Sequence, residues 1–336
     1  MSIVAGIDGG GTKTQVVLLD ESAAWVAVGW GGSANVNFSP REVVVASFRS
    51  ALSQARERLP APGEPVACVV VSSPTPETIY RPIVDEHLAA REVVRAGEGE
   101  TGLAAGAREP FGVCIIAGTG SLAFGRSPGG QTVGCGGWGT IIGDEGSGYA
   151  IGVGGIQAAC RAYDGRGVPT LLVDLLMRRL EMSSFNEIIP FVYRRNTGRR
   201  ELAALAPVVF DAARQGDAVA RGIIRRAGQE LALVAATCAR RLEMASLEFP
   251  VVGAGGVFRG GADLILPATA RYLRASCPLA KLIPARYDPA IGAALIALRR
   301  LGHPLDDSFY DRLDRTLATV QSGMGPGSPG SIGSRR

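Results

Sequence analysis

The chain has 336 residues, of which 46% are hydrophobic and 20% are charged, and its formal net charge is +4. This length predicts about two domains with full hydrophobic cores, and so modest a charge gives no argument for nucleic-acid binding. No apolar run approaches the ~20 residues of a membrane span and no signal peptide precedes the first strand pattern, so we expect a cytoplasmic protein with no membrane partner.

The first third of the chain predicts a mixed α/β sheet. Three strands come first and are followed by alternating helices and strands, an order typical of antiparallel strands that lead into parallel ones. The expected strands cover residues 3–8, 14–20, about 24–30, 66–71 and 93–96. The expected helices cover residues 41–58, 77–89 and about 101–108, and the first of them begins after a Ser39-Pro40 cap.

The pattern then restarts, which predicts a second domain built like the first. A strand over residues 113–117 runs into a glycine turn and a further strand over residues 122–125. Long helical patterns follow over about 149–182 and 207–245, with a helix pair between them, then a strand at 249–253 and a helix at 289–301. We expect an N-terminal domain of residues 1–111 plus about 290–318, a C-terminal domain of residues 112–289 and a disordered tail over residues 321–336.

The most informative stretch lies between the first two strands and reads Gly6-Ile7-Asp8-Gly9-Gly10-Gly11-Thr12-Lys13-Thr14. Three consecutive glycines allow backbone N–H groups to converge in a hairpin, and converging amides bind anions such as phosphate. Asp8 is placed to hold Mg²⁺ through water, and Thr12 and Thr14 add hydroxyl donors. An ordinary hairpin turn is the other reading of these glycines taken alone.

Four glycine-centred motifs occur in order along the chain. They are residues 6–14, Ala117-Gly118-Thr119-Gly120-Ser121, residues 134–152, and Gly253-Ala254-Gly255-Gly256. Each motif alone is weak, but together they resemble the actin-like ATPase and sugar-kinase superfamily. The third motif, GCGGWGTIIGDEGSGYAIG, is more specific and is similar to that of the N-acetylglucosamine kinase group within the BadF/BadG/BcrA/BcrD ATPase family. The resemblance covers the chain from residue 3 to about 300.

This resemblance implies two ribonuclease-H-like α/β domains that bind ATP and a sugar in the cleft between them. It implies Mg²⁺ at Asp8, ATP phosphates at the first two glycine turns and adenosine at the fourth motif. The implied ATP-binding residues are Gly9, Gly10, Gly11, Thr12, Lys13, Thr14, Gly118, Thr119, Gly120, Ser121, Gly253, Ala254, Gly255 and Gly256. A close packing turn between strand and helix is the other reading of the fourth motif.

The resemblance also implies a sugar site made of uncharged and acidic hydrogen-bonding groups. Its implied residues are Asn35, Ser72, Ser73, Thr119, Cys135, Gly137, Trp138 and Asp144. Three of these have plainer readings: Asn35 as a turn residue, Trp138 as a core aromatic and Asp144 as a helix cap. An acid between glycine-rich turns nevertheless costs stability unless it caps a helix or binds something.

The catalytic base is where the chain departs from the resembling family. Phosphoryl transfer to an alcohol is catalysed by positioning and charge stabilisation, with a carboxylate that accepts the hydroxyl proton. The family has an Asp ahead of an alanine-rich helix, and here Glu98 falls on that position, with Glu100 as the next candidate. Glu is one methylene longer, about 1.5 Å. Either the flanking Gly97 and Gly99 let Glu98 reach the hydroxyl, or the enzyme is weak.

Three functions remain in competition. The leading hypothesis is an ATP-dependent kinase that phosphorylates the 6-hydroxyl of N-acetylglucosamine or a closely related amino sugar. The second is an ATPase that drives electron transfer to a partner enzyme through an iron–sulfur cluster, for which Cys135 and Cys160 are the pair to nominate. The third is a sugar or nucleotide sensor, suggested by the glutamate at the base position. The resembling kinases are commonly dimers, so we expect a homodimer on that ground alone.

Overall fold

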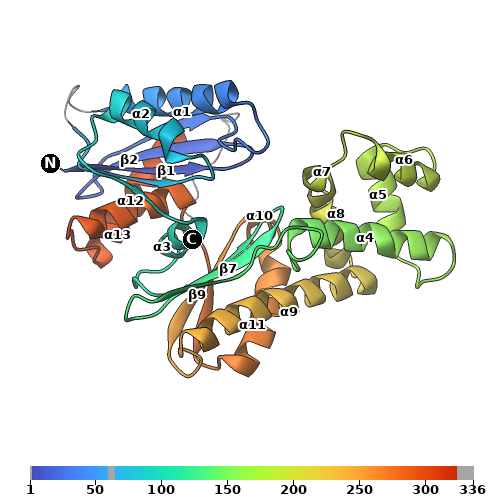
Figure 1. Cartoon of the computed structure of the whole chain (residues 1–336). Coiled ribbons are helices and arrows are strands. Elements are labelled where there is room, and N and C mark those ends of the chain that lie inside the picture. The colour runs from blue at the N-terminus through green and yellow to red at the C-terminus, as the bar shows by residue number, and fades with distance from the viewer. Residues whose placement is uncertain (1, 60–64, 324–336) are drawn as a thin grey trace. The chain divides into compact units, whose positions relative to one another are not determined.

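A computed structural model describes residues 2–59 and 65–323 of the chain. The chain divides into two compact units, which are unit 1 (Met1–Arg108 and Ala285–Arg336) and unit 2 (Glu109–Pro284), and both are drawn in Figure 1. Among the described residues, no helix is both long enough and apolar enough to cross a bilayer.

Unit 1 is a sheet with helices on both faces. Its strands are β1 (Ile3–Gly9), β2 (Thr14–Asp20), β3 (Val26–Gly31), β4 (Cys68–Ser72) and β5 (Val93–Arg95). Its helices are α1 (Arg41–Arg56), α2 (Glu77–Leu88), α3 (Glu98–Ala104), α12 (Pro289–Arg300) and α13 (Asp307–Gly323). The last two helices return to this unit after the chain has passed through unit 2.

Unit 2 combines a second sheet with a larger helical part. Its strands are β6 (Gly112–Ala117), β7 (Ser121–Arg126), β8 (Thr132–Gly136), β9 (Phe249–Ala254) and β10 (Ala280–Pro284). Its helices are α4 (Gly148–Tyr163), α5 (Leu172–Leu180), the 3₁₀ turn η1 (Phe185–Glu187), α6 (Ile188–Tyr193), α7 (Arg199–Ala203), α8 (Ala206–Arg214), α9 (Ala218–Arg241), α10 (Gly256–Gly260) and α11 (Ala262–Ser276).

The two sheets share one topology. Unit 1 has the strand order β3-β2-β1-β4-β5, and unit 2 has the matching order β8-β7-β6-β9-β10 when it is read from the corresponding edge. In each unit the first three strands are antiparallel to their neighbours, and the last two run parallel to the first. The predicted mixed α/β fold, with one architecture used twice, is therefore confirmed.

Side-chain alternation along β1 divides unit 1 into two cores. Ile7 packs with Phe48 of α1 and Tyr80 of α2 on one face. Val4 packs with buried residues of α12 and α13 on the other face. Because alternate residues of a strand point to the same face, Asp8 points to the side of the sheet that α12 covers.

Helix α12 lies directly against β1. A Cβ at Gly6 would come within 1.9 Å of the carbonyl oxygen of Ala290 and within 2.4 Å of the amide nitrogen of Ala294. Both obstructing atoms belong to the helix backbone and cannot rotate away, so only glycine permits this approach. The start of α12 is thereby held over β1, the strand that carries Asp8 near its end.

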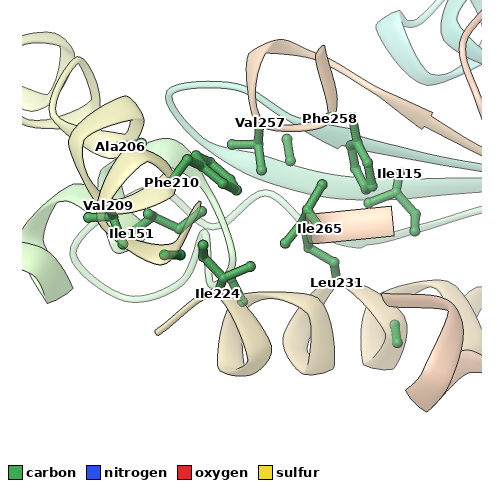
Figure 2. Packing of buried hydrophobic residues seen from close by; sticks show 14 of the residues in the cluster. Ile115, Ile151, Ala206, Val209, Phe210, Ile224, Leu231, Val257, Phe258 and Ile265 are labelled. Carbon is green, nitrogen blue, oxygen red and sulfur yellow. The ribbon is translucent and has the colours of Figure 1, made fainter. Parts of the chain in front are cut away.

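One core cluster joins the sheet and the helices of unit 2, as Figure 2 shows. Ile115 from β6 and Ile151 from α4 belong to it, together with Phe210 from α8, Ile224 from α9 and Ile265 from α11. Interiors packed in this way resist local displacement. The glycine turn between β6 and β7 therefore extends from a tightly packed core.

Each of the two long helical patterns predicted from the sequence contains two helices. The pattern over 149–182 is interrupted after α4, where Gly165 has a φ of 78°. The pattern over 207–245 is interrupted by Gly216 with a φ of 95°, and Asp217 then caps α9 by accepting a hydrogen bond from Ala220 N at 2.8 Å. The predicted helical patterns are present, and a left-handed glycine divides each of them because it ends the first helix of the pair.

Several elements were not predicted, namely β8, β10, α10, α11 and α13. Helix α13 continues to Gly323, so the predicted disordered tail is wrong for residues 321–323, and the remainder of that prediction lies outside the described residues. Helix α3 begins at Glu98, three residues before the predicted start. This last difference bears on the candidate catalytic base.

Candidate functional site

The candidate residues of unit 1 gather at one edge of its sheet. Strands β1, β4 and β5 run parallel to one another. Strand β3 points the same way, because β1 and β3 are both antiparallel to β2. The carboxyl ends of these four strands therefore meet at the same edge of the sheet. Asp8, Asn35, the serine pair 72–73 and Glu98 lie at or just beyond those ends. The structure therefore brings together residues that are up to 90 positions apart, the difference between 98 and 8.

The first glycine turn is held in place by its own backbone. Gly10 N–H donates to the carbonyl of Lys13 at 2.9 Å, and the carbonyl of Gly10 accepts from Ala34 N at 2.8 Å. The hydroxyl of Thr14 donates to the carbonyl of Gly32 at 2.9 Å, which gives it a structural task. Thr12 remains exposed at the tip of the turn. We therefore regard Thr12 and the backbone amides after Gly10 as the groups of this turn that suit a phosphate.

The two predicted serines face opposite sides of the sheet. Ser73 donates its hydroxyl to the carbonyl of Ala34 at 3.2 Å and accepts from Thr75 N at 3.2 Å, which ties it to the loop after β3. Ser72 stands opposite Asp8 in the parallel β1–β4 register. Since directly paired residues share a face, Ser72 lies beside Asp8 on the side covered by α12.

Asn35 has the geometry of a turn residue. Its Oδ1 accepts from Asn37 N at 2.9 Å, and its carbonyl accepts from Phe38 N and Ser39 N, each at 3.0 Å. Within the described residues its NH₂ group has no protein acceptor. The turn reading is therefore correct for the oxygen of this side chain, and hydrogen bonding of the amide group to a sugar stays a prediction.

Glu98 and Glu100 differ in what they do for α3. The carboxylate of Glu100 accepts from Gly97 N at 2.9 Å and so closes the first turn of the helix. This contact explains why α3 begins at Glu98 rather than at Thr101, and it places Gly97 as the N-cap instead of in a slack loop. Glu98 is exposed at the same helix start. Of the two candidate bases, Glu100 is thus the one that closes the first turn of α3.

Sequence reasoning missed a buried pair on the α12 face of unit 1. Gln15 of β2 is fully buried, and its Nε2 donates to Oδ2 of Asp288 at 3.4 Å. Asp288, which is the N-cap of α12, is only 6% exposed. The available signal was a glutamine at the start of an otherwise apolar buried strand. The register pairs Gln15 directly with Asp8.

In unit 2 the second glycine turn sits against a buried carboxylate. A Cβ at Gly120 would lie 2.5 Å from Oδ2 of Asp144, so the missing side chain makes room for the acid. The carbonyl of Gly118 accepts from Gly148 N at 2.7 Å, and Ser121 donates its hydroxyl to the carbonyl of Glu145 at 2.7 Å. The turn and the Asp-Glu-Gly-Ser segment therefore form one assembly.

Asp144 carries the clearest sign of a ligand site in this unit. It is 6% exposed, its φ of 59° is unusual for a residue other than glycine, and its carboxylate has no hydrogen-bond partner among the described residues. The helix-cap reading is wrong, because Ser147 caps α4 by accepting from Ala150 N at 3.2 Å. The Asp144 oxygens are not among the buried, unpartnered side-chain atoms of the described residues, so they reach solvent and are open to a ligand.

The loop that follows Cys135 exposes large apolar side chains. Trp138 is 73% exposed, and Ile141 and Ile142 are exposed by 94% and 75%. The core reading of Trp138 is therefore wrong. Gly137 N–H anchors the loop by donating to the carbonyl of Ser121 at 3.0 Å. An exposed tryptophan beside the Asp144 segment is suited to stack on a ligand.

Cys135 itself faces the helical side of β8. Its Sγ lies 3.6 Å from Nη1 of Arg241 on α9, and it contacts the thiol of Cys238, whose pKa is raised by burial first and by that contact second. Burial also raises the pKa of Cys160, which lies on α4. Contact of Cys135 with substrate stays a prediction.

The fourth motif is explained in part by packing. Gly255 has a φ of 96°, and a Cβ there would come within 2.4 Å of the carbonyl oxygen of Ala117. A Cβ at Gly253 would come within 2.7 Å of the ring of Phe258. Gly256, by contrast, has open space where a Cβ would lie. The packing reading accounts for two of these glycines, and a nucleotide contact at Gly256 stays a prediction.

The described residues contain no group of three or more His, Cys, Asp or Glu side chains placed to hold a metal ion. Mg²⁺ does not need such a cage, because it keeps several water ligands and is bound through one or two carboxylates plus substrate phosphates. Asp8 offers one carboxylate, and the Oε1 atom of Gln15 is a buried acceptor without a hydrogen-bond partner. These oxygen groups fit a hydrated Mg²⁺.

Comparison with known proteins gives consistent matches along the chain. The model of the BadF/BadG/BcrA/BcrD ATPase family matches residues 5–297. An N-acetylmuramic acid/N-acetylglucosamine kinase from Clostridium acetobutylicum is 30% identical over 302 residues, which cover 88% of this chain and 98% of that protein. The crystal structure of a candidate N-acetylglucosamine kinase from Chromobacterium violaceum has 25% identity and a TM-score of 0.65, covering 89% of this chain and 99% of that one.

A ROK family glucokinase from Streptomyces griseus, solved with glucose and AMPPNP, has a TM-score of 0.58 at 17% identity and covers 89% of this chain and 100% of its own. At that identity the likeness concerns the fold alone. The predicted fold of the actin-like ATPase and sugar-kinase superfamily is confirmed.

Proposed function

Because the chain belongs to the BadF/BadG/BcrA/BcrD ATPase family, we propose that it is an ATP-dependent kinase that phosphorylates the 6-hydroxyl of an N-acetylated amino sugar. The relative from Clostridium acetobutylicum is a kinase of N-acetylmuramic acid and N-acetylglucosamine, which supports this substrate class. The observation that carries the proposal is the Asp144 carboxylate, which lies against the Gly118–Gly120 turn and has no hydrogen-bond partner among the described residues. Sugar hydroxyls are the donors that such a carboxylate lacks.

Each unit supplies its own part of the chemistry. In unit 2, Asp144 accepts hydrogen bonds from sugar hydroxyls, Trp138 covers an apolar face of the ligand, and the amides of Thr119 and Gly120 are offered to phosphate. In unit 1, the amides of residues 11–13 are offered to phosphate, and Glu98 accepts the proton of the attacking hydroxyl. Positioning of this kind supplies most of the acceleration in phosphoryl transfer.

Asp8 would hold Mg²⁺ through water, and the ion when bound neutralises negative charge on the phosphates. The chain's own tasks are then to orient the sugar hydroxyl and to remove its proton. Glu98 performs the second task from the exposed start of α3. Its longer side chain extends from a helix that begins where the sequence predicted a loop.

The direct test is an ADP-release assay with ATP and Mg²⁺ against a panel of sugars. The panel contains N-acetylglucosamine, N-acetylmuramic acid, N-acetylmannosamine, glucosamine, glucose and a sample without sugar. We expect ADP release that depends on an N-acetylated sugar. No ADP should be released when carbon 6 of that sugar is blocked. Hydrolysis that is independent of sugar would instead favour an ATPase, and sugar binding without ADP release would favour a sensor.

Replacing Asp144 by Asn should weaken sugar binding more than it slows the chemical step. A hydrogen bond to a charged group contributes about 1.5–3 kcal/mol, so the sugar KM should rise about tenfold to a hundredfold. The ATP KM and the melting temperature should change little, since the carboxylate has no hydrogen-bond partner within the described part of the chain. The exposed Asp174 on α5 provides the matched Asp→Asn control. An unchanged sugar KM in the Asp144 variant would remove this residue from the site.

A further inference from the structure

Four polar side chains share the α12 face of unit 1 near the carboxyl end of its sheet. Asp8, Gln15 and Ser72 are register partners on β1, β2 and β4, and Asp288 reaches them from the start of α12. The next residues inward on this face, such as Val70, belong to the hydrophobic core. The polar cluster therefore marks the point where this core ends at the carboxyl edge of the sheet.

Gln15 is the unusual member of this cluster. It has no exposed surface, and its Oε1 has no hydrogen-bond partner. The orientation of the amide follows from its neighbour, because Oδ2 of Asp288 can only accept and therefore faces Nε2. Oε1 is thus turned away from Asp288. A buried carbonyl without a donor costs about 1–3 kcal/mol, and a donor from outside the chain would remove this cost.

The donor that fits this position is a water molecule of a hydrated cation. Asp8 is the register partner of Gln15, so their Cβ atoms lie about 4.5–5.5 Å apart on one face. Mg²⁺ gives up its water ligands reluctantly, and those waters present strong donors to carboxylate and amide oxygens. Asp288 fixes the orientation of the Gln15 amide and adds a negative charge on its Nε2 side.

We propose that Gln15 and Asp288 are positioning residues for the hydrated Mg²⁺ of the ATP complex, with Oε1 of Gln15 accepting from a metal-bound water beside Asp8. The proposal rests on the proposed use of Mg²⁺ and ATP but not on the identity of the sugar. Gln15 acts through the water shell, and Asp288 acts through Gln15. The start of α12 is thereby tied to the metal site.

The test measures metal binding directly, without turnover. The full-length protein is titrated with Mn²⁺ in the presence of a non-hydrolysable ATP analogue, and free Mn²⁺ is followed by electron paramagnetic resonance. Gln15→Met removes the acceptor at nearly equal volume, and Asp288→Asn removes the charge while keeping the size of the side chain. We expect Mn²⁺ binding to weaken about tenfold in Gln15→Met and about threefold to tenfold in Asp288→Asn.

Gln54→Met is the matched control for stability. Gln54 lies on α1 of the same unit and exchanges hydrogen bonds with the backbone of Trp30 at 2.9 and 3.2 Å, so its loss should lower the melting temperature without changing Mn²⁺ affinity. Mn²⁺ affinities within twofold of the wild type in both test variants would overturn the proposal and leave a structural pair only.

The sugar proposal is tested separately. If no sugar is phosphorylated but the Mn²⁺ affinities fall as expected, the metal assignment stands and the sugar assignment fails. If one test variant does not fold, as judged by its melting temperature without metal, the other decides the question. The two substitutions remove different atoms of the contacts that run from Asp288 through Gln15 to the metal-bound water. The Mn²⁺ affinity of either variant is therefore sufficient to test the proposal.

Discussion

Replacing Glu98 by Gln is expected to lower kcat by about 100-fold to 10,000-fold while the sugar KM changes by less than about threefold. Gln has nearly the same shape but cannot accept the proton of the attacking hydroxyl. The side chain is exposed in the first turn of α3, so loss of its charge should lower stability by no more than about 0.3–1 kcal/mol. Steady-state ADP release with saturating ATP separates kcat from KM.

The control is the same substitution two residues away. Glu100→Gln keeps an oxygen that can accept from Gly97 N–H but removes its charge from the first turn of α3. We expect a loss of about 0.3–1 kcal/mol in stability and a kcat within threefold of the wild type. The reverse pattern, with Glu100→Gln inactive and Glu98→Gln active, would show that the assignment is two residues out of register.

The second large effect is expected on stability, from Gly6→Ala. The new Cβ would lie 1.9 Å and 2.4 Å from backbone atoms of α12, which must move as a body to admit it. Overpacking of this kind typically costs about 1–3 kcal/mol, and an obstructing backbone places this site at the upper end. We expect thermal unfolding of unit 1 about 6–12 °C lower, on a scale of about 2–4 °C per kcal/mol.

Gly134→Ala is the matched control for this strand glycine. Gly134 lies in β8, and no atom lies within 4 Å of the position that a Cβ would take. Its melting temperature should therefore match that of the wild type. A Gly6→Ala protein as stable as this control would show that α12 does not press on β1 as described.

Local patterns predicted most of the fold of unit 1 and less of unit 2. Each glycine hairpin could be recognised because its two strands and its turn are adjacent in sequence. Strand β10 is different, because it pairs only with β9, from which it is separated by α10 and α11. Its five residues AKLIP are partly exposed and carry no clear alternation, so their strand character comes from a distant partner.

The candidate site shows the same division. Asp8 and Asp144 could be identified because they stand inside glycine-rich motifs. The Gln15–Asp288 contact joins residues 273 positions apart, and neither lies in a motif that suggests the other. The start of α3 was misplaced for a different reason: Glu100 was weighed as a base, although its carboxylate closes the helix by bonding Gly97 N–H.

The return of α12 to unit 1 sets an order for synthesis of the protein on the ribosome. Residues 1–108 emerge first, yet the apolar face of β1 beneath Gly6 stays uncovered until residues 289–300 have also emerged. Unit 2 is continuous in sequence and can fold in the interval, because domains fold as units during translation. A chain truncated between residues 121 and 288 would carry both glycine turns and Glu98 but an unfinished unit 1. Interrupted translation therefore releases no active fragment.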